Sequence, residues 1–243
     1  IPGHSSTAVV TSLINLCSQS RQDCMAVIDP PFAFTVDEIV AWQNGTHPLN
    51  AIQFDSSYAA LYWPWVKVYD TFNQIYVWIP PSGSVISTIV LSDKLGAPWY
   101  APAGLNRGLV PNIEATYSAP TLAQRDEMYG GTNAINPIVQ FPGTVGFYIW
   151  GQKTLQRRMT ALNRVNVRRC MLYLEKTIKA RAKFLLFEPD DSTLWGQFTR
   201  MASAVLDDVK TQRGIYDYYV QCDATLNTPD VIQQNQMRAI IGV

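Results

Sequence analysis

The side chains that could carry out chemistry are few and lie apart in the sequence. His4 and His47 are the only histidines in 243 residues. His4 lies close to the start of the sequence, and His47 lies in a turn beside Pro48. Neither accompanies a serine or cysteine in the sharp strand-to-helix turn that exposes a catalytic nucleophile. We therefore expect both histidines to be surface residues, and we expect no nucleophilic catalysis.

Two pairs of adjacent carboxylates could bind a metal or share a proton. Asp190 and Asp191 stand where a long helix is expected to begin, and negative charge is favoured at that end of a helix dipole. Asp207 and Asp208 fall on the predicted solvated face of the same helix. Both pairs are thus explained without acid–base chemistry. The sequence predicts no enzyme, no bound metal and no cofactor.

The four cysteines do not have the spacing of metal ligands. Each lies in an apolar segment, at Cys17, Cys24, Cys170 and Cys222. Buried, reduced thiols are the simplest interpretation and fit folding in a cytoplasm. The glycine-rich positions of the chain are not followed by Lys-Ser or Lys-Thr, so they do not form a phosphate loop.

The charges balance at 19 basic and 19 acidic residues, which removes the usual electrostatic case for binding nucleic acid. The cations gather between Lys153 and Arg213. A cluster at the start of a long predicted helix includes Arg164, Arg168 and Arg169. A solvated helix face is the commonest explanation of such a cluster. The alternative is a surface that pairs with an acidic neighbour.

Two long amphipathic helices dominate the second half of the chain. The segment from Asn163 to Pro189 places apolar residues at helical spacing. They are Val167, Met171, Leu174, Ile178 and Ala182. We expect a short strand at Phe184–Phe187, before a second helix opens at Asp190–Ser192. The core stripe of the second helix is Leu194, Phe198, Met201, Val205 and Val209.

The first half alternates strand and helix signals. Thr35 with Glu38 predicts a capping box. Ala59–Val68 is rich in strand formers, but Pro64 favours an edge strand or a bulge. Residues 93–111 are expected to form a long loop, and Leu122–Tyr129 a short helix. Other predicted elements are a strand at Cys24–Asp29, a helix at Val85–Leu91, a strand at Phe147–Trp150 and strands at Tyr216–Cys222 and Met237–Val243.

This alternation predicts an α/β architecture, a layered sheet with helices packed on it, with α+β as the alternative. We treat residues 1–243 as one region. A sub-boundary near 130–150 would separate an N-terminal α/β part, 1–130, from a C-terminal part, 131–243. No segment is apolar and long enough to cross a bilayer, and no signal peptide is visible.

Several short blocks, in fixed order, resemble the contractile phage tail sheath family. The most specific is a signature loop that contains Pro98, Trp99, Ala103, Gly104, Asn106 and Arg107. The other blocks are Asp29–Pro31, Pro80–Gly83, Asn136–Ile138, Phe141–Gly143, Trp150–Leu155, Val165–Arg169, Phe187–Asp190, Leu194-Trp195, Cys222-Asp223 and Asn227–Pro229. The departures are small: Ala134 stands where glycine is usual, and Lys153 where arginine is common.

The resemblance implies a sheath-core fold and a structural, motor-like function. Sheath subunits stack around an inner tail tube in a metastable state, and contraction drives the tube through the host envelope. Implied partners are other sheath copies, the tube protein, and the baseplate and tail terminator proteins, with no nucleic acid and no membrane insertion. The implied location is the virion tail, assembled in the host cytoplasm. Arg164, Arg168 and Arg169 would pair with acidic groups on the tube or on a neighbouring subunit.

The resemblance also implies that terminal arms add strands to the sheets of neighbouring subunits. The sequence begins without Met and stops at Gly242-Val243, which predicts a core fragment trimmed at both termini and unable to polymerise. Alternatives are the sheath of a phage-derived injection particle or secretion system, an α/β enzyme with an unrecognised site, and a nucleic-acid-binding module.

Overall fold

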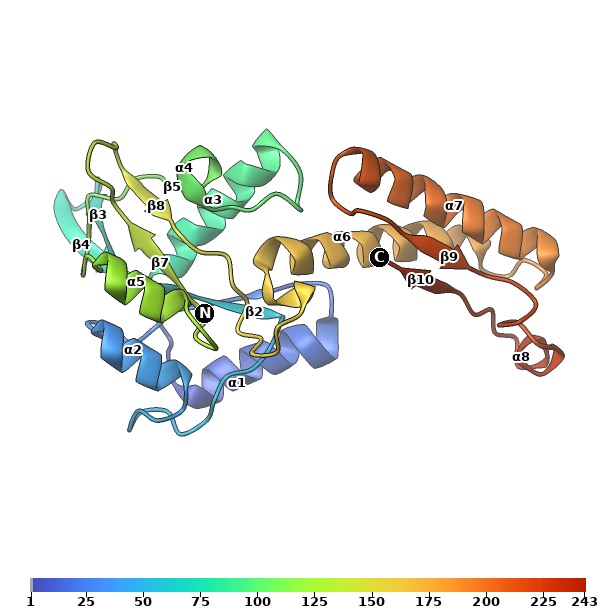
Figure 1. The fold of residues 1–243 in the computed structure, drawn as a ribbon, viewed down its shortest axis with the longest axis horizontal. Coiled ribbons are helices and arrows are strands. Elements are labelled where there is room, and N and C mark those ends of the chain that lie inside the picture. The colour runs from blue at the N-terminus through green and yellow to red at the C-terminus, as the bar shows by residue number, and fades with distance from the viewer. Residues whose placement is uncertain (1) are drawn as a thin grey trace. The chain divides into compact units, whose positions relative to one another are not determined.

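The computed structural model describes residues 2–243, which divide into two compact units. Unit 1 is Ile1–Arg169 and unit 2 is Cys170–Val243. The division falls inside helix α6 (Val165–Ala182). The sub-boundary near 130–150 stays a prediction. Figure 1 labels helices and strands of each unit.

Unit 1 is built on a mixed five-stranded sheet in the order β1-β2-β7-β8-β5. The strands β1, β2 and β7 are parallel to one another, whereas β7–β8 and β8–β5 are antiparallel. Their bounds are β1 Ala26–Ile28, β2 Ala59–Trp63, β7 Ile135–Val139, β8 Phe147–Ile149 and β5 Leu109–Val110. The central strands β2 and β7 are buried along their whole length, so both faces of the sheet are covered.

Alternate residues of β2 enter two separate hydrophobic clusters, as the two-residue period of a strand requires. Ala59, Leu61 and Trp63 pack in a cluster with residues of the helices α1 (Thr7–Asn15) and α2 (Val36–Gln43). Ala60 and Tyr62 pack in the other cluster, which includes Val85 of helix α3 (Pro81–Leu95) and Ile138 of β7. Helices thus cover both faces of the sheet, and the predicted layered α/β architecture is confirmed.

The helices of unit 1 follow the sequence predictions in part. The predicted helix at Val85–Leu91 is the middle of a longer helix, and the prediction of a loop at residues 93–111 is wrong where a short helix and a short strand form. They are α1 Thr7–Asn15, a π-helix η1 Leu16–Arg21, α2 Val36–Gln43, α3 Pro81–Leu95, α4 Gly104–Arg107, α5 Leu122–Tyr129 and the short 3-10 turn η2 Ala161–Asn163. The capping box at Thr35 is present, and a second one opens α5 at Thr121. The predicted helix at Leu122–Tyr129 is confirmed.

The prediction for Ala59–Val68 is wrong. This segment is not one edge strand: β2 lies in the middle of the large sheet and ends at Trp63. Pro64 follows a cis peptide bond, and after it the chain enters β3 (Val66–Asp70) of a different sheet. That sheet has the order β4-β3-β6, with β4 Ile75–Ile79 and β6 Ala115–Thr116. Proline has no N–H for a ladder, so it marks the boundary between two strands.

Unit 2 begins within α6 and contains a second long helix and one small hairpin-like sheet. After the 3-10 turn η3 (Lys183–Leu185) come α7 Ser192–Thr211, β9 Tyr219–Gln221, α8 Pro229–Gln233 and β10 Ile240–Gly242. The antiparallel pair β9–β10 is the whole of this sheet within the described residues. Asp191 caps α7 by accepting hydrogen bonds from the backbone N–H groups of Thr193 and Leu194, both at 2.9 Å.

The predicted core stripe of α7 is confirmed at Leu194, Phe198, Val205 and Val209, whereas Met201 is only half-buried. The predicted strand at Phe184–Phe187 is wrong. The chain there leaves η3 as an exposed connection, and Phe187 adopts a left-handed backbone conformation with φ 70°. A strand would need neighbours for its backbone groups. Phe184, at 86% exposed, and Phe187, at 104%, instead project into solvent.

Candidate interaction site

The signature loop is anchored at Trp99. This side chain is buried, and its backbone carbonyl accepts a 3.1 Å hydrogen bond from Nδ2 of Asn166, near the start of α6. Pro98 beside it is half-buried. Burial of a tryptophan contributes a large apolar area. Two blocks separated by 67 residues are thereby joined in the fold.

The loop continues through α4, where backbone contacts are close. Gly104 opens the helix with φ +80°, and a Cβ on Gly108 would lie 2.7 Å from the backbone N and O of Gly104. The positive φ at residue 104 favours glycine, and the close backbone approach at residue 108 leaves no room for a Cβ. The carbonyl of Gly108 accepts a 2.8 Å hydrogen bond from the backbone N–H of Ile149, which ties the loop to β8.

The polar residues of the loop differ in their exposure. Arg107 turns back on the loop: its Nε donates to the carbonyl of Ala101 at 3.3 Å, and its guanidinium lies 5.0 Å from the ring centre of Tyr100. Ala103 is half-buried, and Asn106 is exposed. Asn106 is therefore open to solvent, whereas Arg107 binds two other residues of the same loop, Ala101 and Tyr100.

A hollow of about 360 Å³ lies beside the loop. The loop, α5 and residues 150–152 form its walls. Arg125 of α5 stacks its guanidinium 5.2 Å from the ring centre of Phe141, whose ring lies 4.5 Å from that of Trp150. Residues 2–243 contain no group of three or more His, Cys, Asp or Glu side chains that could hold a metal ion. The lining of the hollow is mostly apolar, with the cation of Arg125 and the carboxylate of Asp126 at its wall.

The blocks at Asn136–Ile138 and Trp150–Leu155 meet in a buried polar network. Nδ2 of Asn136 donates to the carbonyls of Leu61 at 3.0 Å and Lys153 at 2.8 Å, and its Oδ1 accepts from the backbone N–H of Lys153 at 2.7 Å. A Cβ on Gly151 would lie 2.8 Å from that Oδ1. Asn136 of β7 therefore binds the backbone of Lys153, and Gly151 leaves room for the Asn136 side chain at this close contact.

Lys153 lies at the same junction. Its Nζ donates to the carbonyl of Tyr129 and, at 3.3 Å, to that of Asn133. Burial and the nearby charge of Arg164 lower the pKa of Lys153. The ammonium group is held by backbone carbonyls inside unit 1.

Asp29 joins two further blocks. This buried carboxylate accepts hydrogen bonds from the backbone N–H of Ser82 at 2.8 Å, from its Oγ at 2.7 Å and from the backbone N–H of Gly3 at 3.0 Å. Ser82 lies in the first turn of α3, where the N-cap residue Pro80 has no side-chain acceptor. Asp29 supplies the missing acceptor and a negative charge at the positive end of the helix dipole.

The three arginines of the predicted interface each have a partner within unit 1. Arg164 donates to the hydroxyl of Tyr129 at 2.6 Å. Arg169 donates through one Nη to both carboxylate oxygens of Asp93, at 2.5 and 2.6 Å. Arg168 is buried; it donates to Oγ of Ser57, and its guanidinium lies 4.2 Å from the ring centre of Tyr58. Their role as an interface stays a prediction.

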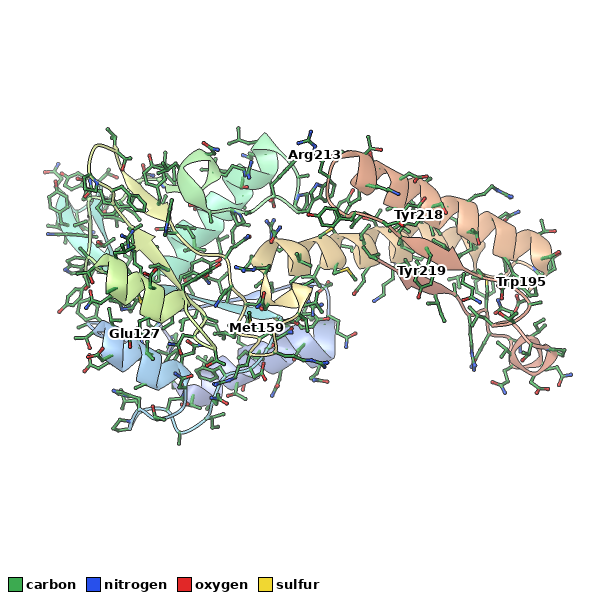
Figure 2. The ribbon with its side chains drawn as sticks, viewed as in Figure 1. Glu127, Met159, Trp195, Arg213, Tyr218 and Tyr219 are labelled. Atoms are coloured by element: carbon green, nitrogen blue, oxygen red, sulfur yellow. The ribbon has the colours of Figure 1, made fainter. Side chains whose placement is uncertain are left out.

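The carboxylates of unit 2 have structural partners. Oδ1 of Asp190 accepts from Nε1 of Trp195 at 2.6 Å, in addition to the cap made by Asp191. Asp207 accepts from the hydroxyl of Tyr218 at 2.6 Å, and Asp208 accepts from Nε2 of Gln212 at 2.9 Å. Figure 2 labels Trp195 and Tyr218 in unit 2. The predictions of capping for the first pair and of helix-surface positions for the second agree with these contacts.

The sheet of unit 2 is the surface that sequence reasoning did not single out. The ring of Tyr219 packs against Gly242, where an added Cβ would lie 2.0 Å from a ring carbon. Tyr219 is 58% exposed and Ile240 is 44% exposed. Within residues 2–243 each strand has a neighbour on one side only, so both have an open edge. The sequence predicted both strands, but not that they pair with each other alone.

Two family models match the chain one after the other. The phage tail sheath protein central domain matches residues 1–155, and the phage tail sheath C-terminal domain matches residues 159–243. The tail sheath proteins of Vibrio phage KVP40 and Enterobacteria phage T4 are each 32% identical, over 92% and 90% of this chain. The chain spans about a third of their length, 35% and 34%.

Solved structures have the same fold. The sheath complex of an extracellular contractile injection system, PVC, in its contracted state superposes with a TM-score of 0.76 at 28% identity, over 90% of this chain and 59% of that one. A chain of the anti-feeding prophage (AFP) baseplate gives a TM-score of 0.77 at 20% identity, over 100% and 63%. No helix between residues 2 and 243 has the length and apolar character needed to span a bilayer.

Proposed function

Because this chain belongs to the phage tail sheath family, we propose that it is the structural subunit of a contractile tail sheath. In this role it polymerises helically around an inner tail tube, and contraction of the polymer drives the tube through the host cell envelope. The observation that carries the proposal is the match of both sheath domains, in order, to residues 1–155 and 159–243. The fold shared with the contracted PVC sheath supports it further.

The function is structural and not enzymatic. The residues of the signature blocks form internal contacts: Asn136 holds Lys153, Asp29 caps α3 and Trp99 anchors its loop. Such contacts fix the shape of a subunit that must repeat accurately in a helical polymer. Asn136, Asp29 and Trp99 thus serve the fold of the subunit.

The partners are other copies of the subunit, the inner tube, the baseplate and the tail terminator. The subunit acts in the virion tail after assembly in the host cytoplasm. Contact between copies uses the open edges of β9 and β10, to which a neighbouring chain adds a strand. Main-chain hydrogen bonds then supply the partners that these edges lack in the single chain.

A second assembly contact is proposed at Arg164, Arg168 and Arg169. In this hypothesis the cations attract acidic groups on the tube or on a neighbouring subunit. Their internal partners, such as Asp93 for Arg169, fix the positions from which the charges act. Charge reversal that leaves assembly and contraction intact would reject the hypothesis.

A second candidate is the sheath of a phage-derived injection particle. The structural similarity to the PVC and AFP particles favours it, whereas the sequence similarity to the phage proteins favours the virion. Both candidates share the mechanism above. The presence or absence of capsid and DNA in the particles that carry this chain separates them.

Immunogold electron microscopy of particles tests the proposal directly. Antibodies raised against residues 1–243 are applied to extended and contracted particles from cells that make the protein. We expect gold along the whole tail shaft, over a shorter and wider shaft after contraction. Gold confined to the capsid, the baseplate or no part of the particle would overturn the proposal.

A further inference from the structure

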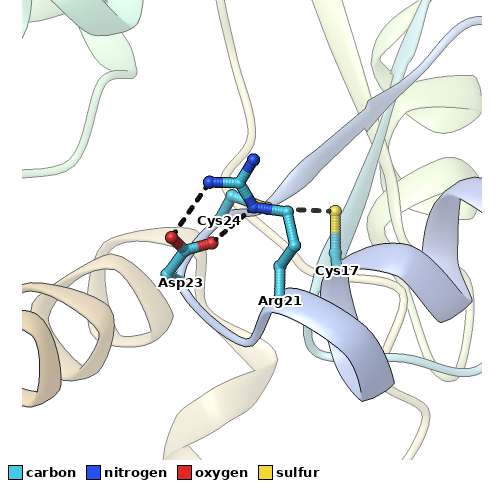
Figure 3. Close-up of polar contacts among 4 residues, drawn as sticks. All are labelled: Cys17, Arg21, Asp23 and Cys24. Carbon is cyan, nitrogen blue, oxygen red and sulfur yellow. Dashed lines mark hydrogen bonds and ion pairs between the residues drawn. The ribbon is translucent and has the colours of Figure 1, made fainter.

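Cys17 and Cys24 form a pair of free thiols in unit 1. The Sγ atoms lie 3.6 Å apart, with the thiol of Cys24 directed at the sulfur of Cys17 (Figure 3). A disulfide bond is about 2.0 Å long, so the two sulfurs need to approach by about 1.6 Å. No other part of the proposed sheath function uses this pair.

Regular structure holds the pair in place from both sides. Cys17 lies in the π-helix η1, a rare form that often marks functional positions. The chain then reverses at Gln22, which has φ 56° and donates its N–H to the carbonyl of Cys17 at 3.0 Å. On the other side, the backbone N–H of Ala26, where β1 begins, donates to the carbonyl of Tyr58 at 2.7 Å.

An ion pair braces the turn between the thiols. Arg21 donates from Nε and one Nη to the two carboxylate oxygens of Asp23, at 2.9 and 3.0 Å (Figure 3). Both side chains are largely exposed, so the pair itself contributes little stability. Its effect is geometric, because it closes the same turn that a bond between residues 17 and 24 would close.

We propose that Cys17 and Cys24 are a redox pair, reduced in a bacterial cytosol and closed to an intramolecular disulfide by a peroxide or a small-molecule disulfide in an oxidising medium. With hydrogen peroxide, the Cys24 thiolate attacks one oxygen, forms a sulfenic acid and releases hydroxide. The Cys17 thiolate then attacks the Cys24 sulfur and expels a second hydroxide. Two thiols and one peroxide thus give one disulfide and two water molecules.

The order of the two steps follows from burial. Cys17 is 3% exposed, whereas Cys24 is half-buried and the more accessible to an oxidant. Burial, and secondarily the hydrogen bond with Cys24, raise the pKa of Cys17 to about 12; Arg21 lowers this pKa and Asp23 raises it. Because the thiolate is the attacking form, the rate of disulfide closure rises with pH from neutrality upward.

Peptide mapping tests the proposal cleanly, because trypsin cuts between the two cysteines after Arg21. The folded 243-residue chain is exposed to hydrogen peroxide or to glutathione disulfide, its remaining thiols are blocked, and it is digested without reductant. We expect peptides 1–21 and 22–67 to be recovered joined, and to separate after reduction. Peptides joined through Cys170 or Cys222, or four blocked thiols after oxidation, would overturn the proposal.

Two variants and an unfolded sample complete the experiment. Cys24→Ser should abolish the joined peptides, whereas Cys222→Ser should leave their yield unchanged. In denaturant, the same oxidation should give mixed pairings, because the π-helix and the turn no longer bring residues 17 and 24 together. Equal selectivity for the 17–24 bond in folded and unfolded chains would show that the fold does not position the pair.

Discussion

Unit 1 and unit 2 differ most in the size of their sheets, whereas both pair a buried asparagine with distant backbone groups, Asn136 in unit 1 and Asn227 in unit 2. In unit 1, buried polar groups find partners far away in the same chain: Asp29 holds Ser82, and Asn136 holds Lys153. The main sheet has five strands and helices on both faces. In unit 2, one helix has a buried stripe, and the sheet has only the two short strands β9 and β10.

In unit 1 the central strands β2 and β7 are buried along their whole length. Within the described residues of unit 2, both strands of the sheet are edge strands. Aromatic side chains are exposed in both units, at Tyr216, Tyr219 and Phe187 in unit 2 and at Phe72 and Tyr76 in unit 1. A two-stranded sheet is marginal by itself, and such edges readily accept strands from other chains. If the proposed sheath function is right, we expect linkage between copies to use the β9 and β10 edges of unit 2.

The largest effect is expected from Asn136→Ala in unit 1. The change removes three hydrogen bonds at a fully buried position and leaves the backbone of Lys153 without its partners. We expect a loss of about 3–5 kcal/mol in the free energy of unfolding, measured by urea denaturation. Asn106→Ala, at an exposed position, is the matched control and should change stability by less than about 0.5 kcal/mol.

Asp29→Ala should have the next largest effect. It removes the acceptor for the backbone N–H and hydroxyl of Ser82 and leaves the start of α3 uncapped. We expect a loss of about 2–3 kcal/mol, measured by thermal and urea unfolding. Asp37→Ala, in the exposed first turn of α2, is the control and should cost about 0.3–1 kcal/mol. Equal losses for the two variants would contradict the capping role of Asp29.

Arg169→Ala separates internal from external roles of the arginine cluster. The side chains of Arg169 and Asp93 are 13% and 33% exposed, so solvent weakens their ion pair, and we expect a loss of about 1–2 kcal/mol. The charge swap Asp93→Arg with Arg169→Asp should recover stability. If the swapped chain also assembles normally, as scored by electron microscopy, the proposed external role of Arg169 is rejected.

Asp191→Ala tests local structure in unit 2. Loss of the cap on the backbone N–H groups of Thr193 and Leu194 should cost about 1 kcal/mol. Thr121→Ala, at the cap of α5 in unit 1, should cost a similar amount. Helix caps act locally, so the two variants should lose similar free energies of unfolding. A loss well above about 1 kcal/mol in only one unit would show that its cap supports more than its own helix.

Phe187→Gly should change stability least. Glycine relieves the left-handed backbone by about 1 kcal/mol but costs about 0.5–1 kcal/mol in conformational entropy, so the two effects nearly cancel. The fully exposed ring is nevertheless lost, and sheath yield should fall. Unchanged stability together with unchanged sheath assembly, measured by sedimentation, would show that the Phe187 ring takes no part in contacts between copies.

Local patterns made much of this fold predictable. The capping box at Thr35, the helix at Leu122–Tyr129 and the cap and stripe of α7 depend on residues within a few positions of one another. Side-chain period and cap chemistry therefore describe them fully. The family resemblance added the order of the blocks, which local patterns do not contain.

Long-range contacts account for what the sequence did not predict. β7 was missed because Pro137 lies inside it, although the strand is completely buried in the middle of the sheet. The partner of Arg169 lies 76 residues away at Asp93, so a charge cluster that looked solvated is internally paired. Nor does a single sequence reveal that the turn after the π-helix brings the thiol of Cys24 to the thiol of Cys17.

Amide hydrogen exchange at Tyr219–Gln221 and Ile240–Gly242 tests the central claim most directly. The chain is compared alone and within sheaths of purified particles, with the central strand β2 of unit 1 as an internal reference. We expect fast exchange at the β9 and β10 edges in the single chain, slowed about 100-fold or more in the sheath, with β2 protected in both. Strong protection of β9 and β10 in the single chain, or exchange that stays fast in the sheath, would contradict it.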